Sequence, residues 1–257
     1  MTTIETTAWT LVVEQRVAVA TFSHPPRNLM TFADMTELEQ IVRKVADDES
    51  ISVLVIASDI PDYFVAHGDL EDLLRLGRGE PYAGDAGSWP RTLGLFGTMP
   101  QIVVAAINGQ AWGGGLELSL ACTLRIAGPA ASLGLCEVGL GLIPGGGGTQ
   151  RLPRLIGAGR AAEMVLTSRP IDADEALRIG LVQAVLPDAP FIDAVLDWVA
   201  ALAAQPPQAL RAAKKSLAGA EYLPLEQGLA LEGELVGPLL ADPEAVSLQE
   251  QELARHR

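Results

Sequence analysis

A glycine-rich stretch at residues 108–151 constrains this chain more than any other part of its sequence. Three consecutive glycines, residues 113–115, follow an apolar, β-branched run and precede a run of helix-forming residues. This order predicts a strand that turns into a helix at the glycines, and such a turn leaves backbone N–H groups without partners. Glu117 falls in the first turn of the predicted helix, and Glu137 follows further along the stretch. The sequence therefore predicts two carboxylates beside one glycine turn.

The composition excludes several classes of protein. A chain of 257 residues, of which 49% are hydrophobic, can bury a large core. Its net charge of −14 argues against nucleic-acid binding through phosphate neutralisation. No run approaches the roughly 18 uninterrupted apolar residues of a membrane helix, and the first residues lack the features of a secretory or transit peptide. The two cysteines fit a reducing compartment. Together, these features lead us to expect a cytoplasmic protein with no nucleic-acid or membrane partner.

Hydrophobic periodicity predicts strands and helices that alternate along most of the chain. Strands are expected at residues 10–14, 17–22, 51–57, 101–107, 124–127, 132–135 and 181–186. Helices are expected at residues 31–47, 70–76, 91–98, 116–121, 150–156, 159–166 and 172–179, with Thr31 and Asp172 as N-caps. Beyond Pro190 the chain is predicted to be helical, with interruptions at Pro206, Pro207, Pro224, Pro238 and Pro243. Residues 77–90 contain Gly and Pro without periodicity and predict a mobile loop.

This pattern predicts an α/β protein. We expect a core that carries the active site over residues 1–190, and a helical region over residues 191–257. The helices after Pro190 carry more leucines than one thin layer over the core should need, which favours an oligomer. The alternative is that these helices fold back on their own core.

Each feature of the glycine-rich stretch also has a purely structural interpretation. Consecutive glycines before a helix can simply allow a strand and a helix to pack closely. Glu117 could complement the helix dipole, and Glu137 could be a solvated loop acid. The second glycine run, residues 145–148, is not a Walker-type phosphate loop, because no lysine follows it. The three histidines show no ligand spacing, so no metal site is expected.

Three segments, at residues 101–118, 137–152 and 173–182, resemble the signatures of the enoyl-CoA hydratase/isomerase (crotonase) superfamily nearly residue for residue. The resemblance covers about residues 10–220. It implies a crotonase-like spiral of ββα repeats and a helical C-terminal region that makes trimer contacts, commonly in hexamers of two trimers. It also implies an acyl-CoA thioester as substrate, with no cofactor, since coenzyme A is part of that substrate.

The resemblance assigns a role to each polar group of the stretch. Adding water across a C=C bond conjugated to a thioester places negative charge on the carbonyl oxygen, which two fixed N–H donors would stabilise. By resemblance these donors belong to Gly68 and Gly114. A base must polarise the water and an acid must protonate C2; by resemblance Glu117 holds the water and Glu137 exchanges the proton. Contacts with coenzyme A are implied for Arg27, Leu29, Ala66, His67, Asp69, Leu70 and Gly113.

Two expectations concern the surroundings of these groups. One carboxyl must be protonated when it delivers its proton, which apolar neighbours such as Leu135, Val138 and Leu140 would favour. The C-terminal residues 236–257 lack the basic and aromatic ending usual in the family. The basic residues left to face the phosphates of coenzyme A are Arg27, Lys214, Lys215, Arg255, His256 and Arg257.

From these features we expect an enoyl-CoA hydratase, which adds water reversibly to a 2-enoyl-CoA and gives a 3-hydroxyacyl-CoA. The alternatives are a Δ3-Δ2 enoyl-CoA isomerase and a crotonase-fold protein that binds without turnover. The presence of both glutamates favours the hydratase, because isomerisation can be run by one carboxylate at the position of Glu137.

Overall fold

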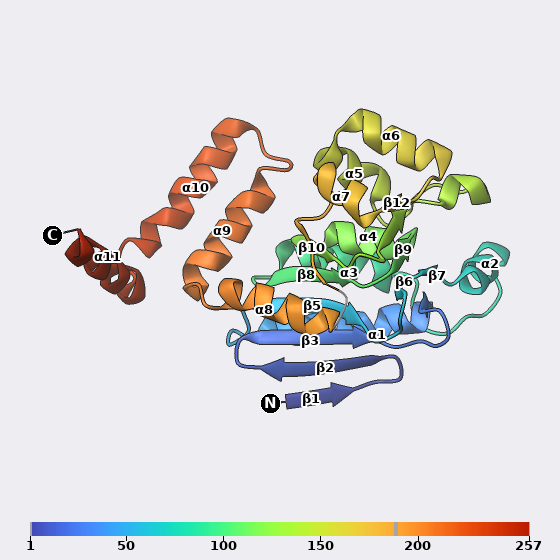
Figure 1. Ribbon diagram of the computed structural model, residues 1–257, viewed down its shortest axis with the longest axis horizontal. Coiled ribbons are helices and arrows are strands. Elements are labelled where there is room, and N and C mark those ends of the chain that lie inside the picture. The colour runs from blue at the N-terminus through green and yellow to red at the C-terminus, as the bar shows by residue number, and fades with distance from the viewer. Residues whose placement is uncertain (1, 188–189, 257) are drawn as a thin grey trace.

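A seven-stranded sheet forms the centre of the computed structural model, which describes residues 2–187 and 190–256 (Figure 1). Its order is β1-β2-β3-β5-β8-β10-β13; β1, β2 and β3 pair antiparallel, and every later pair is parallel. The bounds are β1 (Thr2–Glu5), β2 (Trp9–Glu14), β3 (Val17–Phe22), β5 (Val53–Ser58), β8 (Ile102–Ile107), β10 (Leu124–Ala127) and β13 (Ala184–Val185).

A second, four-stranded sheet of order β12-β11-β9-β6 is built from much shorter strands. They are β6 (Tyr63–Val65), β9 (Gln110–Trp112), β11 (Ser132–Gly134) and β12 (Ile171–Asp172), and a separate pair joins β4 (Leu29–Met30) to β7 (His67–Gly68). Three of the long strands, β5, β8 and β10, are each followed by a short strand of the second sheet and then by a helix. This repeat confirms the predicted ββα architecture of the crotonase fold.

The helices lie close to their predicted positions. Their bounds are α1 (Phe32–Asp47), α2 (Leu70–Arg78), α3 (Ser88–Thr98), α4 (Gly114–Ala121), the 3₁₀ turn η1 (Glu137–Leu140), α5 (Gly148–Ile156), α6 (Ala158–Thr167), α7 (Ala173–Arg178), α8 (Phe191–Ala203), α9 (Pro207–Gly219), α10 (Leu225–Leu239) and α11 (Pro243–Arg255). Thr31 and Asp172 cap α1 and α7 as expected. The predicted interruption at Pro238 is wrong: α10 ends only one residue later, so the missing N–H costs little there.

Both faces of the large sheet are covered, as the continuous apolar run at β5 predicts. Leu54 and Ile56 belong to one hydrophobic cluster, which includes residues of α1 and α3. Val53 and Val55 belong to a second cluster, in which α8 covers the sheet. The boundary at residue 190 stays a prediction. Beyond α9, helices α10 and α11 contain no buried residue and extend away from the body (Figure 1). None of the described helices is long and apolar enough to cross a membrane.

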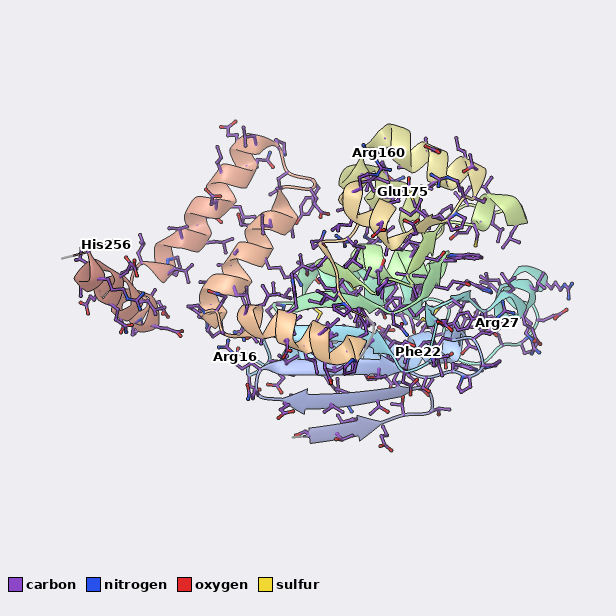
Figure 2. The ribbon with its side chains drawn as sticks, in the orientation of Figure 1. Arg16, Phe22, Arg27, Arg160, Glu175 and His256 are labelled. Atoms are coloured by element: carbon purple, nitrogen blue, oxygen red, sulfur yellow. The ribbon has the colours of Figure 1, made fainter. Side chains whose placement is uncertain are left out.

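Lys214 does not face the solvent, so its expected role as a phosphate contact is wrong. Its side chain is buried, and Nζ donates hydrogen bonds to the carbonyl oxygens of Phe96 (2.8 Å), Met99 (2.8 Å) and Gln101 (2.6 Å). The lysine thus ties α9 to the end of α3 and the start of β8. Figure 2 shows His256 and Arg27 on opposite sides of the molecule, so His256 is not placed to contact the same phosphates as Arg27. Arg257 lies outside the described residues.

Replacing Lys214 with methionine should lower the free energy of unfolding by about 3 kcal/mol, because three carbonyl oxygens lose a charged donor in a buried site. The matched control is Lys215→Met on the exposed side of the same helix, which should change stability by no more than about 0.5 kcal/mol. Urea unfolding of both variants measures the difference. Equal stability of the two variants would show that the buried lysine does not hold α9 in place.

Candidate active site

A cavity of about 790 Å³ lies between α1, α2, α3, α4 and the loop that contains η1. Most of the residues predicted to form the site line it: Arg27, His67, Gly68, Asp69, Leu70, Gly113, Gly114, Glu117 and Glu137. Leu29 and Ala66 are not among the lining residues. Ala66 is fully buried, its N–H donates to the carbonyl of Asn28, and its carbonyl accepts the N–H of Trp112. The backbone of Ala66 therefore holds neighbouring segments together.

Helix α4 approaches strand β6 so closely that its second residue must be glycine. A Cβ atom on Gly115 would lie 1.9 Å from the carbonyl oxygen of Val65. This contact also brings Gly114 beside Gly68, since a Cβ on Gly114 would lie 3.5 Å from the backbone nitrogen of Gly68. Gly113, with φ of +51°, makes the turn and donates its N–H to the carbonyl of Gly134 (2.8 Å). The N–H of Gly114 opens the helix and has no partner within it.

Glu117 is buried with one oxygen fixed and the other uncommitted. Its side chain is only 3% exposed, and Oε1 accepts the N–H groups of Gly146 (2.7 Å) and Gly148 (2.8 Å). Arg151 holds this loop by donating to the carbonyl of Gly146 (2.7 Å). Burial raises the pKa of Glu117, while the two N–H bonds and the charge of Arg151 oppose that rise. Among the described residues no hydrogen bond uses Oε2, so this oxygen can hold a ligand.

Glu137 faces the same glycine turn from the first position of η1. A Cβ on Gly113 would lie 3.2 Å from its Oε1, and Oε2 is buried without a hydrogen-bond partner in the described part of the chain. Burial raises the pKa of Glu137 to about 7, and the negative charge of Glu117 adds to the rise. Leu135 is buried nearby, whereas Leu140 is about half exposed on the cavity wall. A carboxyl in this state can give or take a proton near neutral pH.

Trp89 lines the cavity but is not predicted from the sequence. Trp89 lies in the first turn of α3, inside the stretch expected to be a loop, and its ring faces the cavity. No periodic pattern marks it, because α3 begins directly after a Gly- and Pro-containing segment. Cys136 also lines the cavity, next to Glu137. Among residues 2–187 and 190–256 no group of three or more His, Cys, Asp or Glu side chains is arranged to hold a metal ion.

The chain is similar in sequence and in structure to proteins of one family. The family model of enoyl-CoA hydratase/isomerase matches residues 13–245. A short-chain-enoyl-CoA hydratase of Clostridium acetobutylicum is 31% identical over 233 residues, 87% of this chain and 86% of that protein. A mitochondrial methylglutaconyl-CoA hydratase of Mus musculus is 37% identical over 201 residues, 76% of this chain and 63% of the relative. The crystal structure of an enoyl-CoA hydratase from Bacillus anthracis superimposes with a TM-score of 0.87 at 32% identity, covering 96% of each chain.

Proposed function

The chain belongs to the enoyl-CoA hydratase/isomerase family, and from that membership we propose that it adds water reversibly to a 2-enoyl-CoA to give a 3-hydroxyacyl-CoA. The observation that carries the proposal is the contrast between the two carboxyls at one glycine turn. Glu117 has one oxygen anchored by two N–H donors, and Glu137 is unpaired with a pKa near 7. Two titratable groups with such different surroundings are suited to separate acid and base roles.

The proposed reaction uses each group once. The thioester carbonyl oxygen accepts the N–H groups of Gly68 and Gly114, which stabilise the charge it gains as the C=C electrons move toward it. Ionised Glu117 takes a proton from the water, whose oxygen forms the bond to C3. Protonated Glu137 gives its proton to C2. The reverse reaction, loss of water, starts with Glu137 ionised and Glu117 protonated.

Binding of coenzyme A has to overcome the net charge of −14. Arg27 is exposed at the cavity and is the cation that we propose for the phosphates (Figure 2). We also propose that His67, Gly68, Asp69 and Leu70, which line the cavity, contact the substrate, with Gly113 beside the thioester. Phe32, Met35 and Trp89 give the cavity apolar walls that suit an acyl chain.

Incubation with crotonyl-CoA tests the proposal, because hydration removes the absorbance of the conjugated thioester. We expect that absorbance to fall and 3-hydroxybutyryl-CoA to appear. A protein that leaves crotonyl-CoA unchanged but converts a 3-enoyl-CoA into a 2-enoyl-CoA would be an isomerase instead. Binding of acyl-CoA without either reaction would support the non-catalytic alternative.

The rate of hydration should depend on pH through Glu137. Because hydration requires the protonated carboxyl, and burial raises the pKa of Glu137 to about 7, kcat/KM for crotonyl-CoA should fall as pH rises above about 7, by about tenfold per pH unit. Dehydration requires the ionised carboxyl and should fall as pH drops below about 7. Steady-state rates of hydration and of dehydration, each measured at pH values below and above 7, test both dependences. A hydration rate that stays constant above pH 7 would contradict the assignment of Glu137 as the acid.

The C-terminal helices support a further part of the proposal, assembly into trimers or hexamers. Apolar side chains on α10 and α11 are exposed in the single chain, from 38% for Val246 to 78% for Leu225. Helices that folded back on their own core would bury these residues. Sedimentation equilibrium at micromolar concentration should therefore give a mass of three or six chains of 27.1 kDa. A monomeric mass would contradict the proposed assembly.

A further inference from the structure

The proposed reaction gives no role to the indole Nε1 of Trp89, a polar atom on the wall of the cavity. The Trp89 ring is partly buried against the hydrophobic core and lines the cavity. Its Nε1 donates no hydrogen bond to any described residue. An indole N–H can only donate, and a partly buried one normally has an acceptor. The two other indole groups near this region differ: Trp112 donates to Ser132 Oγ (3.0 Å) and Trp9 donates to the carbonyl of Asp34 (3.0 Å).

The edge of the Trp89 ring runs from the oxyanion glycine to the free oxygen of Glu117. A Cβ on Gly114 would lie 3.6 Å from Trp89 Cζ2. A Cβ on Gly146 would lie 2.6 Å from Trp89 Nε1 and 2.7 Å from Glu117 Oε2. The indole donor and the carboxylate acceptor therefore both pack against Gly146, and because both lie within 2.7 Å of one point they are no more than 5.3 Å apart, a separation that one water molecule can bridge. No direct hydrogen bond joins the two atoms.

The cavity that both groups line has room for a water molecule that bridges them. A water oxygen here would accept the N–H of Trp89 through one lone pair and donate one hydrogen to Glu117 Oε2. Its second lone pair would remain for bond formation. Gly146 lets the two groups lie this close together, since a Cβ at that position would clash with both.

We infer that Trp89 binds the attacking water and orients it toward C3. This inference rests on the proposed hydratase function and adds a residue to it. As the oxygen–C3 bond forms from the free lone pair, the water proton passes to Glu117, the C=C electrons move to the thioester carbonyl, and the proton of Glu137 goes to C2. Trp89 keeps its own proton throughout. Its N–H fixes the direction of the lone pair that attacks, which is a positioning contribution to the rate.

The competing explanation is that Trp89 only supplies an apolar wall for the acyl chain. The variant Trp89→Phe separates the two, because it keeps most of the ring and removes the N–H. The matched control is Trp198→Phe in α8, on the second hydrophobic cluster and away from the cavity. Two reactions are measured for each protein: hydration of crotonyl-CoA, and exchange of the C2 protons of butyryl-CoA in D₂O. The exchange needs Glu137 and the oxyanion donors but no attacking water.

We expect Trp89→Phe to lower kcat for hydration by about tenfold or more, the effect of losing one hydrogen bond in the transition state. KM and the exchange rate should stay within about threefold of the wild-type values, and Trp198→Phe should match the wild type in both reactions. Hydration that is unchanged in Trp89→Phe, or exchange that falls as much as hydration, would overturn the inference while leaving the proposed function intact. A wild-type protein that exchanges C2 protons but never hydrates would overturn the proposed function, and the inference with it.

A second variant, at Gly146, tests the same bridging water without changing Trp89 itself. Gly146→Ala keeps the indole N–H but adds a methyl group that would clash with Nε1 and with Glu117 Oε2, so the two groups must move apart. It should also lower hydration more than exchange. Circular dichroism and thermal unfolding establish that each variant is folded, so the pair of variants tests the inference even if one of them does not fold. Hydration at the wild-type rate in Gly146→Ala would show that no reacting water needs to bridge these two groups.

Discussion

Replacing Glu137 with glutamine should lower the rate of crotonyl-CoA hydration by at least about 100-fold, the typical effect of removing a positioned acid or base. Glutamine keeps the shape of the side chain but cannot transfer a proton to C2. The fold should be unaffected, because Glu137 Oε2 has no hydrogen-bond partner to lose in the described structure and the change removes a charge that Glu117 repels. Initial rates and a thermal unfolding curve of the same preparation measure both quantities.

The variant Glu117→Gln should be compared with Glu137→Gln, because the two glutamates are proposed to have different roles. It should lower hydration by a similar factor of at least about 100, since the water loses its base. Any trace conversion of a 3-enoyl-CoA into a 2-enoyl-CoA needs proton exchange at C2 but no water. That activity should therefore survive Glu117→Gln better than Glu137→Gln. Hydration that persists in Glu137→Gln, or isomerisation lost equally in both variants, would show that the two roles have been assigned wrongly.

The sequence predicts the central part of this site because the information there is local. A β-branched run, three glycines and a helix-forming run predict β8, the glycine turn and α4 without knowledge of any other segment, although they miss the short β9 between β8 and the glycines. The N-cap at Thr31 is local in the same way, since the side chains of Thr31 and Asp34 bond to each other's backbone. Such contacts join residues three or four positions apart, so they can be predicted from a short stretch of sequence.

Contacts between distant segments leave no comparable pattern. Of the strands of the second sheet only β11 is predicted, at residues 132–135; β6, β9 and β12 are two or three residues long, too short for an alternation of apolar and polar residues to appear. Lys214 looks like an exposed helical cation until the carbonyls of Phe96, Met99 and Gln101 are placed around it. The raised pKa of Glu137 likewise depends on burial by residues from several elements. These features follow from the fold, and the sequence alone could only supply candidates.

The glycine at position 115 shows how one long-range contact can control both stability and activity. In the sequence it is the third of three equivalent glycines, and close strand–helix packing was one of their possible explanations. In the structure it is the residue at which α4 touches β6. Gly114 and Glu117 stand on the same helix, one residue before and two residues after it. Any movement of α4 away from β6 therefore moves the proposed oxyanion donor Gly114 and the carboxylate of Glu117 together.

Gly115→Ala should therefore lower the free energy of unfolding by about 3 kcal/mol and nearly abolish hydration. The added Cβ would lie 1.9 Å from the carbonyl oxygen of Val65, so the backbone of α4 or β6 must shift to relieve the clash. The matched control is Gly94→Ala inside α3, where a Cβ meets nothing within 4 Å. There the higher helix propensity of alanine should stabilise the protein by up to about 1 kcal/mol. Urea unfolding and crotonyl-CoA turnover of both variants test this, and a Gly115→Ala protein as stable and active as Gly94→Ala would show that α4 and β6 can separate without cost.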